Sequence, residues 1–165
     1  MRPEQSVSVK GYDDVEFLIS TNPGESIKPL SHVASGGELS RIMLAIKTVL
    51  AGKDGVGTLI FDEIDAGISG RTAWKVSEQL DTVAGSTQVL CITHLPQIAA
   101  MADRHFVIEK SSTEDNTITD IRAMEGEESL GELARLLGAD AMTEAALTNA
   151  REMRGQALKH KEMSG

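Results

Sequence analysis

Three acidic residues follow an apolar run near the middle of the chain. The run Thr58–Phe61 is followed directly by Asp62 and Glu63, and Asp65 comes shortly after. Such a run is typical of a buried strand in a parallel sheet, and ligands of α/β proteins gather at the carboxyl ends of these strands. Paired carboxylates there can hold Mg²⁺ and activate a water beside a phosphate. The alternative is a pair of solvated acids at a strand end.

A second candidate lies upstream, where Ser35, Gly36, Gly37 and Glu38 begin an amphipathic run. Ser35 and Glu38 have the spacing of a capping box at a helix start. The two glycines would leave the first helical amides unshielded, so an anion could approach them closely. The alternative is an ordinary helix cap. Arg41, in the same helix, is expected to orient that helix or to form a surface ion pair.

The third candidate is His94, which directly follows the apolar strand predicted at 88–93. If that strand lies beside the strand at 58–61, His94 shares a sheet edge with Glu63. A histidine there can donate a hydrogen bond to a γ-phosphate or position a water. The alternative is a histidine that caps the next helix.

The surrounding pattern predicts the elements that must position these side chains. Helices and strands alternate through the centre, which favours right-handed crossovers and a largely parallel sheet in one domain, 1–165. The expected strands are a hairpin within 6–20, then 58–61, 88–93, 105–110 and 117–123, with a loop at 21–30. One helix is expected to begin at Ser35, and the others are expected over residues 71–83, 95–102, 129–137 and 143–159.

Composition narrows the class of protein. The 165 residues carry a net charge of −9 and no cluster of Lys and Arg, so the chain is not an obvious nucleic-acid binder by itself. A disulfide framework is excluded because Cys91 is the single cysteine, and it is expected to be a small buried hydrophobe. No signal-peptide pattern or membrane-spanning run is found. These features fit a reducing cytoplasm and no membrane partner.

Taken in order, the motifs resemble the carboxyl-terminal half of an ABC-type ATPase head. The flanking segments 33–41, 61–70 and 93–99 are similar to a family of bacterial DNA repair ATPases related to the structural-maintenance-of-chromosomes (SMC) proteins. The resemblance extends over roughly residues 6–160. The matching motifs are the signature (Ser35–Glu38), Walker B (Leu59–Glu63), the D-loop (Asp65–Gly67) and the switch histidine (His94).

This resemblance implies a three-layer α/β head of the P-loop NTPase type, with a mainly parallel sheet flanked by helices. It implies ATP and Mg²⁺ in the complete head, with Asp62 as the metal ligand and Glu63 and His94 as catalytic residues. The nucleotide held by a second head of a homodimer would be bound by Ser35, Gly36, Gly37, Glu38 and Asp65. The implied process is DNA double-strand-break repair and recombination at the nucleoid. DNA would be engaged through the full-length protein rather than clearly through this chain.

One departure from the family matters. The sequence contains no Gly-x-x-x-x-Gly-Lys-Ser/Thr phosphate loop, and Gly52-Lys53-Asp54 has neither the upstream glycine nor the hydroxyl. The chain is therefore expected to be a segment that begins near the end of a coiled coil and pairs with the amino-terminal, Walker A half of the head. Alone it should hydrolyse ATP poorly. Two alternatives stay open: a Mg²⁺-dependent nuclease or phosphotransferase using Asp62, Glu63 and Asp65, and a non-enzymatic association module.

Overall fold

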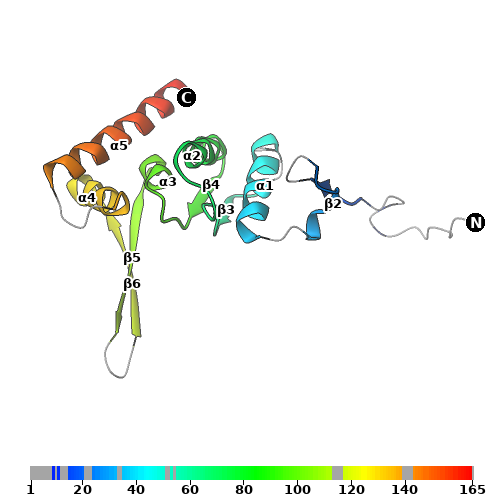
Figure 1. Cartoon of the computed structure of the whole chain (residues 1–165), viewed down its shortest axis with the longest axis horizontal. Helices are drawn as coiled ribbons and strands as arrows, with labels where there is room; N and C mark the ends of the chain where they lie inside the picture. Colours follow the sequence, from blue (N-terminus) through cyan, green and yellow to red (C-terminus); the bar gives the residue numbers. More distant parts are fainter. Residues whose placement is uncertain are drawn as a thin grey trace, which may run out of the picture. The chain divides into compact units, whose positions relative to one another are not determined.

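The computed structural model in Figure 1 describes most of the chain in two compact units, Met1–Ser35 and Gly36–Gly165. Each unit is described by itself, and the domain prediction of 1–165 stays a prediction. The described residues are 9, 11, 15–20, 24–32, 35–50, 53, 55–112, 117–138 and 143–164, without the side chains of Ser112 and Ser164.

The amino-terminal unit holds a short antiparallel pair. Strand β1 (Leu18–Ile19) pairs with β2 (Lys28–Pro29), and the 3₁₀ turn Leu30–His32 follows. The pair is closed by a hydrogen bond of 2.8 Å from Leu30 N to Phe17 O. The first strand and the turn of the predicted hairpin within 6–20 fall largely outside the described residues. The observed partner of β1 comes instead from the segment predicted as a loop. Pro29 has no amide hydrogen, so β2 cannot continue as a regular ladder.

The second unit begins with a strand–helix–strand arrangement that positions the candidate site. Strands β3 and β4 are parallel, with Thr58 opposite Gln88 and Phe61 opposite Cys91. This pairing confirms that the residues following the two strands share one sheet edge. The elements are α1 (Gly36–Val49), β3 (Thr58–Phe61), α2 (Gly70–Ala84) and β4 (Gln88–Cys91).

The remaining elements are three helices and a long hairpin. Strands β5 and β6 pair antiparallel along their whole length, from His105–Met124 to Ser112–Thr117, and the hairpin extends away from α3 and α4 (Figure 1). The α/β class is confirmed, but in the described residues parallel pairing is confined to β3 and β4. The bounds are α3 (Pro96–Met101), β5 (His105–Ser112), β6 (Thr117–Met124), α4 (Gly126–Leu136) and α5 (Glu144–Ser164).

Two apolar clusters hold this unit together. The first joins α1, α2 and α3 to one face of β3 through Leu44, Phe61, Ile64, Val76, Leu80, Val83 and Ile98. The second is rich in alanine, which lets α3, α4 and α5 approach closely: Ala99, Ala100, Met101, Leu133, Ala134, Ala150 and Ala157. Burial of this apolar surface provides the main stabilisation.

Charged side chains fasten α5 to the helices beneath it. Lys161 Nζ contacts Asp81 at 2.7 Å and Asp103 at 2.8 Å. Arg154 donates to the carbonyl oxygens of Ala100 and Ala102 at the end of α3. Because the last carbonyls of a helix have no intrahelical partner, these bonds satisfy groups that would otherwise need water.

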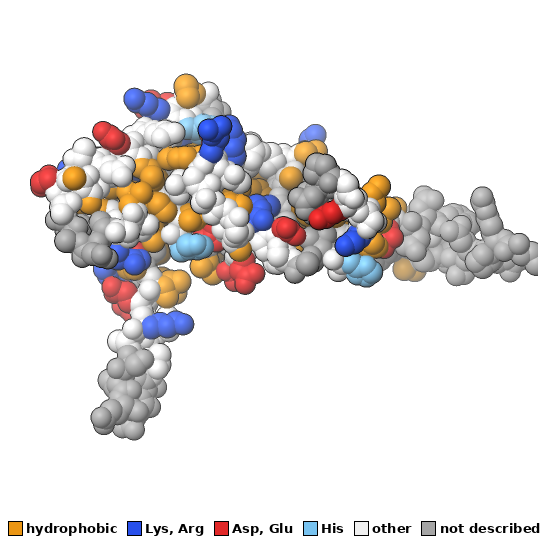
Figure 2. All heavy atoms as spheres, in the orientation of Figure 1, with side chains coloured by type: hydrophobic (Ala, Val, Ile, Leu, Met, Phe, Trp, Pro, Cys, Tyr) orange, Lys and Arg blue, Asp and Glu red, His pale blue; other side chains and the backbone are white. Residues whose placement is uncertain are grey.

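Apolar side chains also remain at the surface, and two groups of them lie on the parallel strand pair and on the hairpin. On the outer face of the parallel pair these are Ile60, Leu90 and Ile92, and on the hairpin they include Phe106, Ile108 and Ile121. Figure 2 shows hydrophobic side chains along the described part of the hairpin. Along the described part of the chain, no helix is both long enough and apolar enough to cross a membrane.

Candidate functional site

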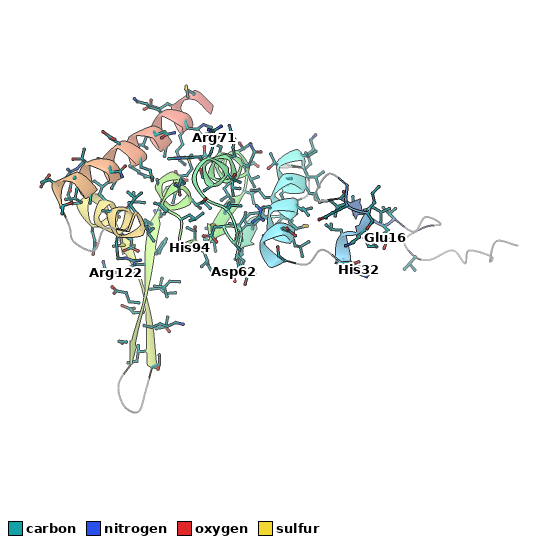
Figure 3. The ribbon with its side chains drawn as sticks, in the orientation of Figure 1. Glu16, His32, Asp62, Arg71, His94 and Arg122 are labelled. Carbon is teal, nitrogen blue, oxygen red and sulfur yellow. The ribbon has the colours of Figure 1, made fainter. Side chains whose placement is uncertain are left out.

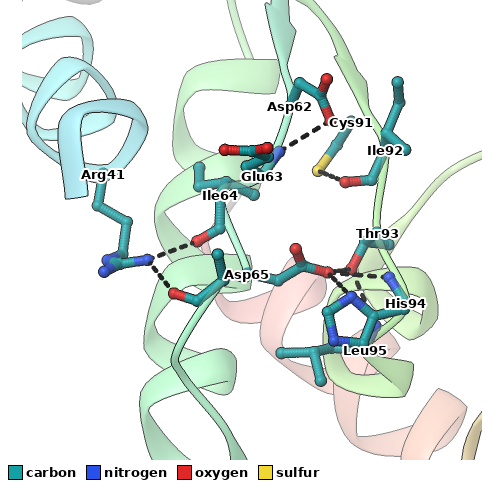
Figure 4. Close-up of polar contacts among 11 residues, drawn as sticks. Arg41, Asp62, Glu63, Ile64, Asp65, Cys91, Ile92, Thr93, His94 and Leu95 are labelled. Atoms are coloured by element: carbon teal, nitrogen blue, oxygen red, sulfur yellow. Dashed lines mark hydrogen bonds and ion pairs between the residues drawn. The ribbon is translucent and has the colours of Figure 1, made fainter. Parts of the chain in front are cut away.

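The site is built on the turn that follows β3 (Figure 4). Asp62 Oδ1 accepts a hydrogen bond of 2.9 Å from the amide of Glu63, and Ala66 N donates to Glu63 O at 2.9 Å. Ser40 of α1 donates to the carbonyl oxygen of Asp62 at 2.8 Å. The turn is therefore closed locally and is also fastened to α1.

Glu63 has an unusual backbone conformation at this turn. Its φ of +56° lies in the left-handed region, and no other described non-glycine residue has a positive φ. A side chain in that region costs of order 1–3 kcal/mol, and such strain gathers at functional sites. The carboxylate lies against the first residue of α1, because a Cβ on Gly36 would collide with Glu63 Oε2. The proposed water-activating group and the helix start are thus in direct contact.

Gly37 packs against the backbone of the same turn, which gives way to a side chain less easily than the flexible end of Glu63 beside Gly36. A Cβ at this position would lie 2.7 Å from Glu63 O and 2.9 Å from Ala66 Cβ. No side chain fits without movement of the backbone, so glycine lets α1 approach the turn. This contact gives an intrachain reason for the glycine. The predicted role of the glycines toward a nucleotide stays a prediction.

Arg41 links the same helix to the turn. Its Nη1 donates to Ile64 O at 3.1 Å and to Ala66 O at 2.8 Å. One guanidinium nitrogen therefore satisfies two carbonyl oxygens that the turn leaves without a ladder partner. This arrangement agrees with the interpretation that Arg41 orients the helix, because its hydrogen bonds go to backbone carbonyl oxygens rather than to a surface carboxylate.

Asp65 turns inward and meets the end of β4. Its Oδ2 accepts hydrogen bonds from Thr93 Oγ1 at 2.6 Å and from the amide of His94 at 2.8 Å, and it lies 3.0 Å from His94 Nδ1. The Asp65 side chain is 5% exposed, whereas that of His94 is 73% exposed. Burial by itself would raise the pKa of Asp65. The bonds from Thr93 and His94 and the attraction of His94 outweigh burial, and the pKa of Asp65 lies below its usual value.

Apart from the buried Asp65, the predicted site residues fall into three groups. Asp62, Glu63 and His94 are exposed at the carboxyl ends of β3 and β4, and Figure 3 labels Asp62 and His94 along that edge. Gly36 and Gly37 lie against the same turn. Glu38 is in the first turn of α1, whereas Ser35 belongs to the amino-terminal unit.

Sequence reasoning did not identify two residues of this site. Thr93 bonds Asp65 and also accepts a hydrogen bond of 3.0 Å from the amide of Leu95, and Ser40 holds the backbone of Asp62. The only sequence signal for Thr93 is a hydroxyl directly before the histidine at the strand end. Ser40 gives no signal, because its partner lies far along the chain.

The three carboxylates do not form one centre. Asp65 is buried against Thr93 and His94, while Asp62 and Glu63 are exposed. Among the described residues there is no group of three or more His, Cys, Asp or Glu side chains that could hold a metal ion. A nuclease built on Asp62, Glu63 and Asp65 together therefore gains no support.

Cys91 lies at the end of β4 beside the first apolar cluster. Burial, together with the negative charges of Asp65 and Asp62, raises the pKa of its thiol to about 12. A thiol with so high a pKa is a poor nucleophile at neutral pH, because the thiolate is the reactive form. Cys91 therefore acts as a partly buried packing residue.

The described residues therefore bring together a parallel strand pair with acids after one strand, a histidine after the next, and a glycine-rich helix start against the same turn. These are the motifs on which the sequence resemblance to an ABC- and SMC-like ATPase head rests.

No protein-family model matches the chain. The chain is 50% identical over 143 residues to the DNA repair protein RecN of Halalkalibacterium halodurans, covering 87% of this chain and 25% of that protein. It is 51% identical over 150 residues to RecN of Treponema pallidum, covering 91% and 26%. Over the part that it spans, the chain is similar to RecN proteins along most of its length. That part is about a quarter of the length of these relatives.

The chain is also similar to a solved structure. It comes from work on the structural biochemistry of ATP-driven dimerization and DNA-stimulated activation of SMC ATPases. The two chains are 20% identical with a TM-score of 0.48, and the match covers 75% of this chain and 81% of the other.

Proposed function

We propose that this chain is the carboxyl-terminal lobe of the ATP-binding and ATP-hydrolysing head of a DNA double-strand-break repair and recombination ATPase. The observation that carries the proposal is the meeting of Asp62, Glu63 and His94 at one sheet edge, with the start of α1 against the same turn. The identity to RecN proteins supports the same reading. The parent protein is proposed to work in the cytoplasm, at the nucleoid.

The exposed carboxylates fit the implied ATP and Mg²⁺. Magnesium in phosphate sites is held by one or two carboxylates together with phosphate oxygens and water, and Asp62 offers such a carboxylate at the strand end. When bound, Mg²⁺ neutralises negative charge on the phosphates. Glu63 would polarise the attacking water, and His94 would contact the water or the γ-phosphate. Gly36 and Gly37 would approach the nucleotide of a second head with Ser35, Glu38 and Asp65.

The phosphate loop must come from elsewhere, because the sequence does not contain one. The proposed source is the amino-terminal half of the same head. The exposed apolar residues Ile60, Leu90 and Ile92 give that half a surface to cover, as do Phe106 and Ile108 on the hairpin. Exposed apolar surface of this kind marks interaction sites.

The test is ATP turnover in the presence of Mg²⁺ by this chain alone, and after mixing with a separately made amino-terminal half. We expect little turnover by the chain alone and clear turnover on mixing. Glu63→Gln should abolish the turnover of the mixture, whereas Glu162→Gln, an exposed acid of α5, should preserve it. Robust turnover by the chain alone would contradict the split-head proposal.

A further inference from the structure

Glu63 lies between two peptide groups that are each fixed by hydrogen bonds. Because a peptide group is planar, the two planes on either side of a residue define its φ and ψ. In the plane before Glu63, the carbonyl oxygen of Asp62 accepts from Ser40 Oγ at 2.8 Å, and the Glu63 amide donates to Asp62 Oδ1 at 2.9 Å. In the plane after it, Glu63 O accepts from Ala66 N at 2.9 Å. These bonds together fix the φ of +56° at Glu63.

Of these bonds, that of Ser40 alone comes from another element. The bonds within the turn would move with the turn, whereas Ser40 belongs to α1. Arg41 of the same helix fastens the far end of the turn, since its Nη1 donates to Ile64 O and Ala66 O (Figure 4). The turn is thus held to α1 on both sides of Glu63.

A left-handed conformation at a glutamate needs such support. Residues with a Cβ rarely adopt it, and it persists only where the surrounding structure imposes it. Extended backbone would send the Asp62 and Glu63 side chains to opposite faces of the strand. At the bend both are exposed, and the Glu63 carboxylate lies against Gly36 at the start of α1. Whatever holds the bend therefore also sets the direction of that carboxylate.

We propose that Ser40 is a positioning residue. Its hydroxyl holds the peptide group before Glu63 and so keeps Glu63 in the left-handed conformation that directs its carboxylate. What the carboxylate does rests on the proposed function, whereas the hold on the backbone follows from the chain's own hydrogen bonds. Arg41 secures the far end of the turn, and Ser40 sets the orientation at Glu63 itself. Ser40 acts through Glu63 and needs no contact with the nucleotide.

The first test measures the backbone at Glu63 in solution. One-bond and three-bond scalar couplings at its Cα distinguish positive from negative φ in NMR of the isotope-labelled chain. We expect a positive φ in the parent chain and a large population with negative φ in Ser40→Ala. Ser40→Thr keeps a hydroxyl and should keep the positive φ. A negative φ in the parent chain, or an unchanged positive φ in a folded Ser40→Ala variant, would overturn the proposal.

Thr48→Ala is the matched control, because it removes another hydroxyl of α1. Thr48 Oγ1 donates within the helix, to Leu44 O at 2.9 Å, so the φ of Glu63 should stay positive in this variant. Thermal unfolding shows whether each variant is folded. If Ser40→Ala is not, adding Glu63→Gly should restore folding, because glycine adopts a positive φ without strain. A double variant that stays unfolded would count against the proposal.

The last measurement distinguishes this proposal from the proposed function. In the head reconstituted with the amino-terminal half, Ser40→Ala should lower kcat by about 10²-fold with little change in KM, because a correctly placed base contributes on that scale. Ser40→Thr should restore kcat, and Thr48→Ala should leave it unchanged. A parent-like kcat in Ser40→Ala would overturn the positioning role. If the couplings are as expected but the reconstituted head hydrolyses no ATP, the proposed function fails and the hold of Ser40 on Glu63 stands.

Discussion

The turn after β3 and the β5–β6 hairpin differ in how far their side chains are buried. In the turn, Ile64 is fully buried, and the buried Asp65 accepts hydrogen bonds from the Thr93 hydroxyl and the His94 amide. On the hairpin, Ile121 is 63% exposed and Ile108 is 50% exposed. Each region has an arginine: Arg41 bonds carbonyl oxygens in the turn, and Arg122 pairs with acids at the surface.

The difference distinguishes a region whose hydrogen bonds are satisfied within this chain from a region whose apolar surface is left for the proposed partner to cover. Buried polar groups are tolerated only when their hydrogen bonds are made, and the turn makes them within this chain. The hairpin instead leaves apolar residues exposed to solvent, which agrees with the proposal that the other half of a head covers them. Matched pairs of variants, one in each region, test this contrast.

The largest expected effect comes from a pair of isoleucines. Ile64→Ala should lower the free energy of unfolding by about 2–5 kcal/mol, because it empties space in the first apolar cluster. Ile121→Ala on the hairpin should cost less than about 0.5 kcal/mol, since surface substitutions are usually that mild. Urea unfolding followed by circular dichroism gives both values. Equal losses would mean that the hairpin is covered in solution.

Ile121→Ala should have a clear effect on binding of the amino-terminal half, although it has little effect on the stability of the isolated chain. If that half covers the hairpin, Ile121→Ala should weaken its binding, whereas the same variant leaves the stability of the isolated chain nearly unchanged. Titration calorimetry with the parent chain and Ile121→Ala measures this. Unchanged affinity would remove the hairpin from the proposed interface.

Two neighbouring glycines give the next effect. Gly37→Ala should cost about 1–3 kcal/mol, because its Cβ would press on the backbone oxygen of Glu63 and on Ala66. Gly36→Ala should cost less, because the colliding atom is the end of the flexible Glu63 side chain. Both are at the start of α1, so helix propensity is matched. Thermal unfolding of the two variants checks the order, and a larger loss for Gly36→Ala would contradict the packing.

The sequence predicted the parts of this region that depend on local pattern. The apolar runs at β3 and β4 and the amphipathic run of α1 were sufficient to place Asp62 and His94 at one edge. The interior role of Asp65 was not predictable, because its partner Thr93 lies on another strand end and no spacing rule connects them. The pairing of β1 was missed for a similar reason, since its two-residue partner carries no strand pattern.

Substituting the two arginines should change the free energy of unfolding by a smaller amount. The loss is expected at Arg41, which bonds the turn, and not at Arg122, which pairs with exposed acids. Arg41→Met keeps an apolar stem and removes the donor to Ile64 O and Ala66 O, and it should cost about 1–3 kcal/mol for carbonyls left without a partner. Arg122→Met should leave the free energy of unfolding unchanged within error, because its partners Glu128 and Glu109 are exposed. Urea unfolding of both variants in low and in high salt distinguishes a loss of hydrogen bonds at Arg41 from a loss of surface ion pairs at Arg122. A salt-sensitive loss at Arg122 alone would invert the comparison.

The smallest effect is a pH dependence at Asp65. The pKa of Asp65 in the folded chain lies below its usual value of 3.8, so its ionised form is the one that folding favours. Stability from this group is therefore present above the unfolded pKa and is lost as the pH falls through the folded pKa. Asp65→Asn should be less stable than the parent at neutral pH, and the gap should narrow below about pH 4.

Asp120→Asn on the hairpin controls for the change in charge, because that carboxylate is exposed. Urea midpoints of the parent and both variants across the acid range give the comparison. A gap between parent and Asp65→Asn that is constant with pH would mean that the carboxylate acts only through its shape. A gap that narrows as the pH falls would show that the negative charge of Asp65 itself strengthens its hydrogen bonds with the Thr93 hydroxyl and the His94 amide.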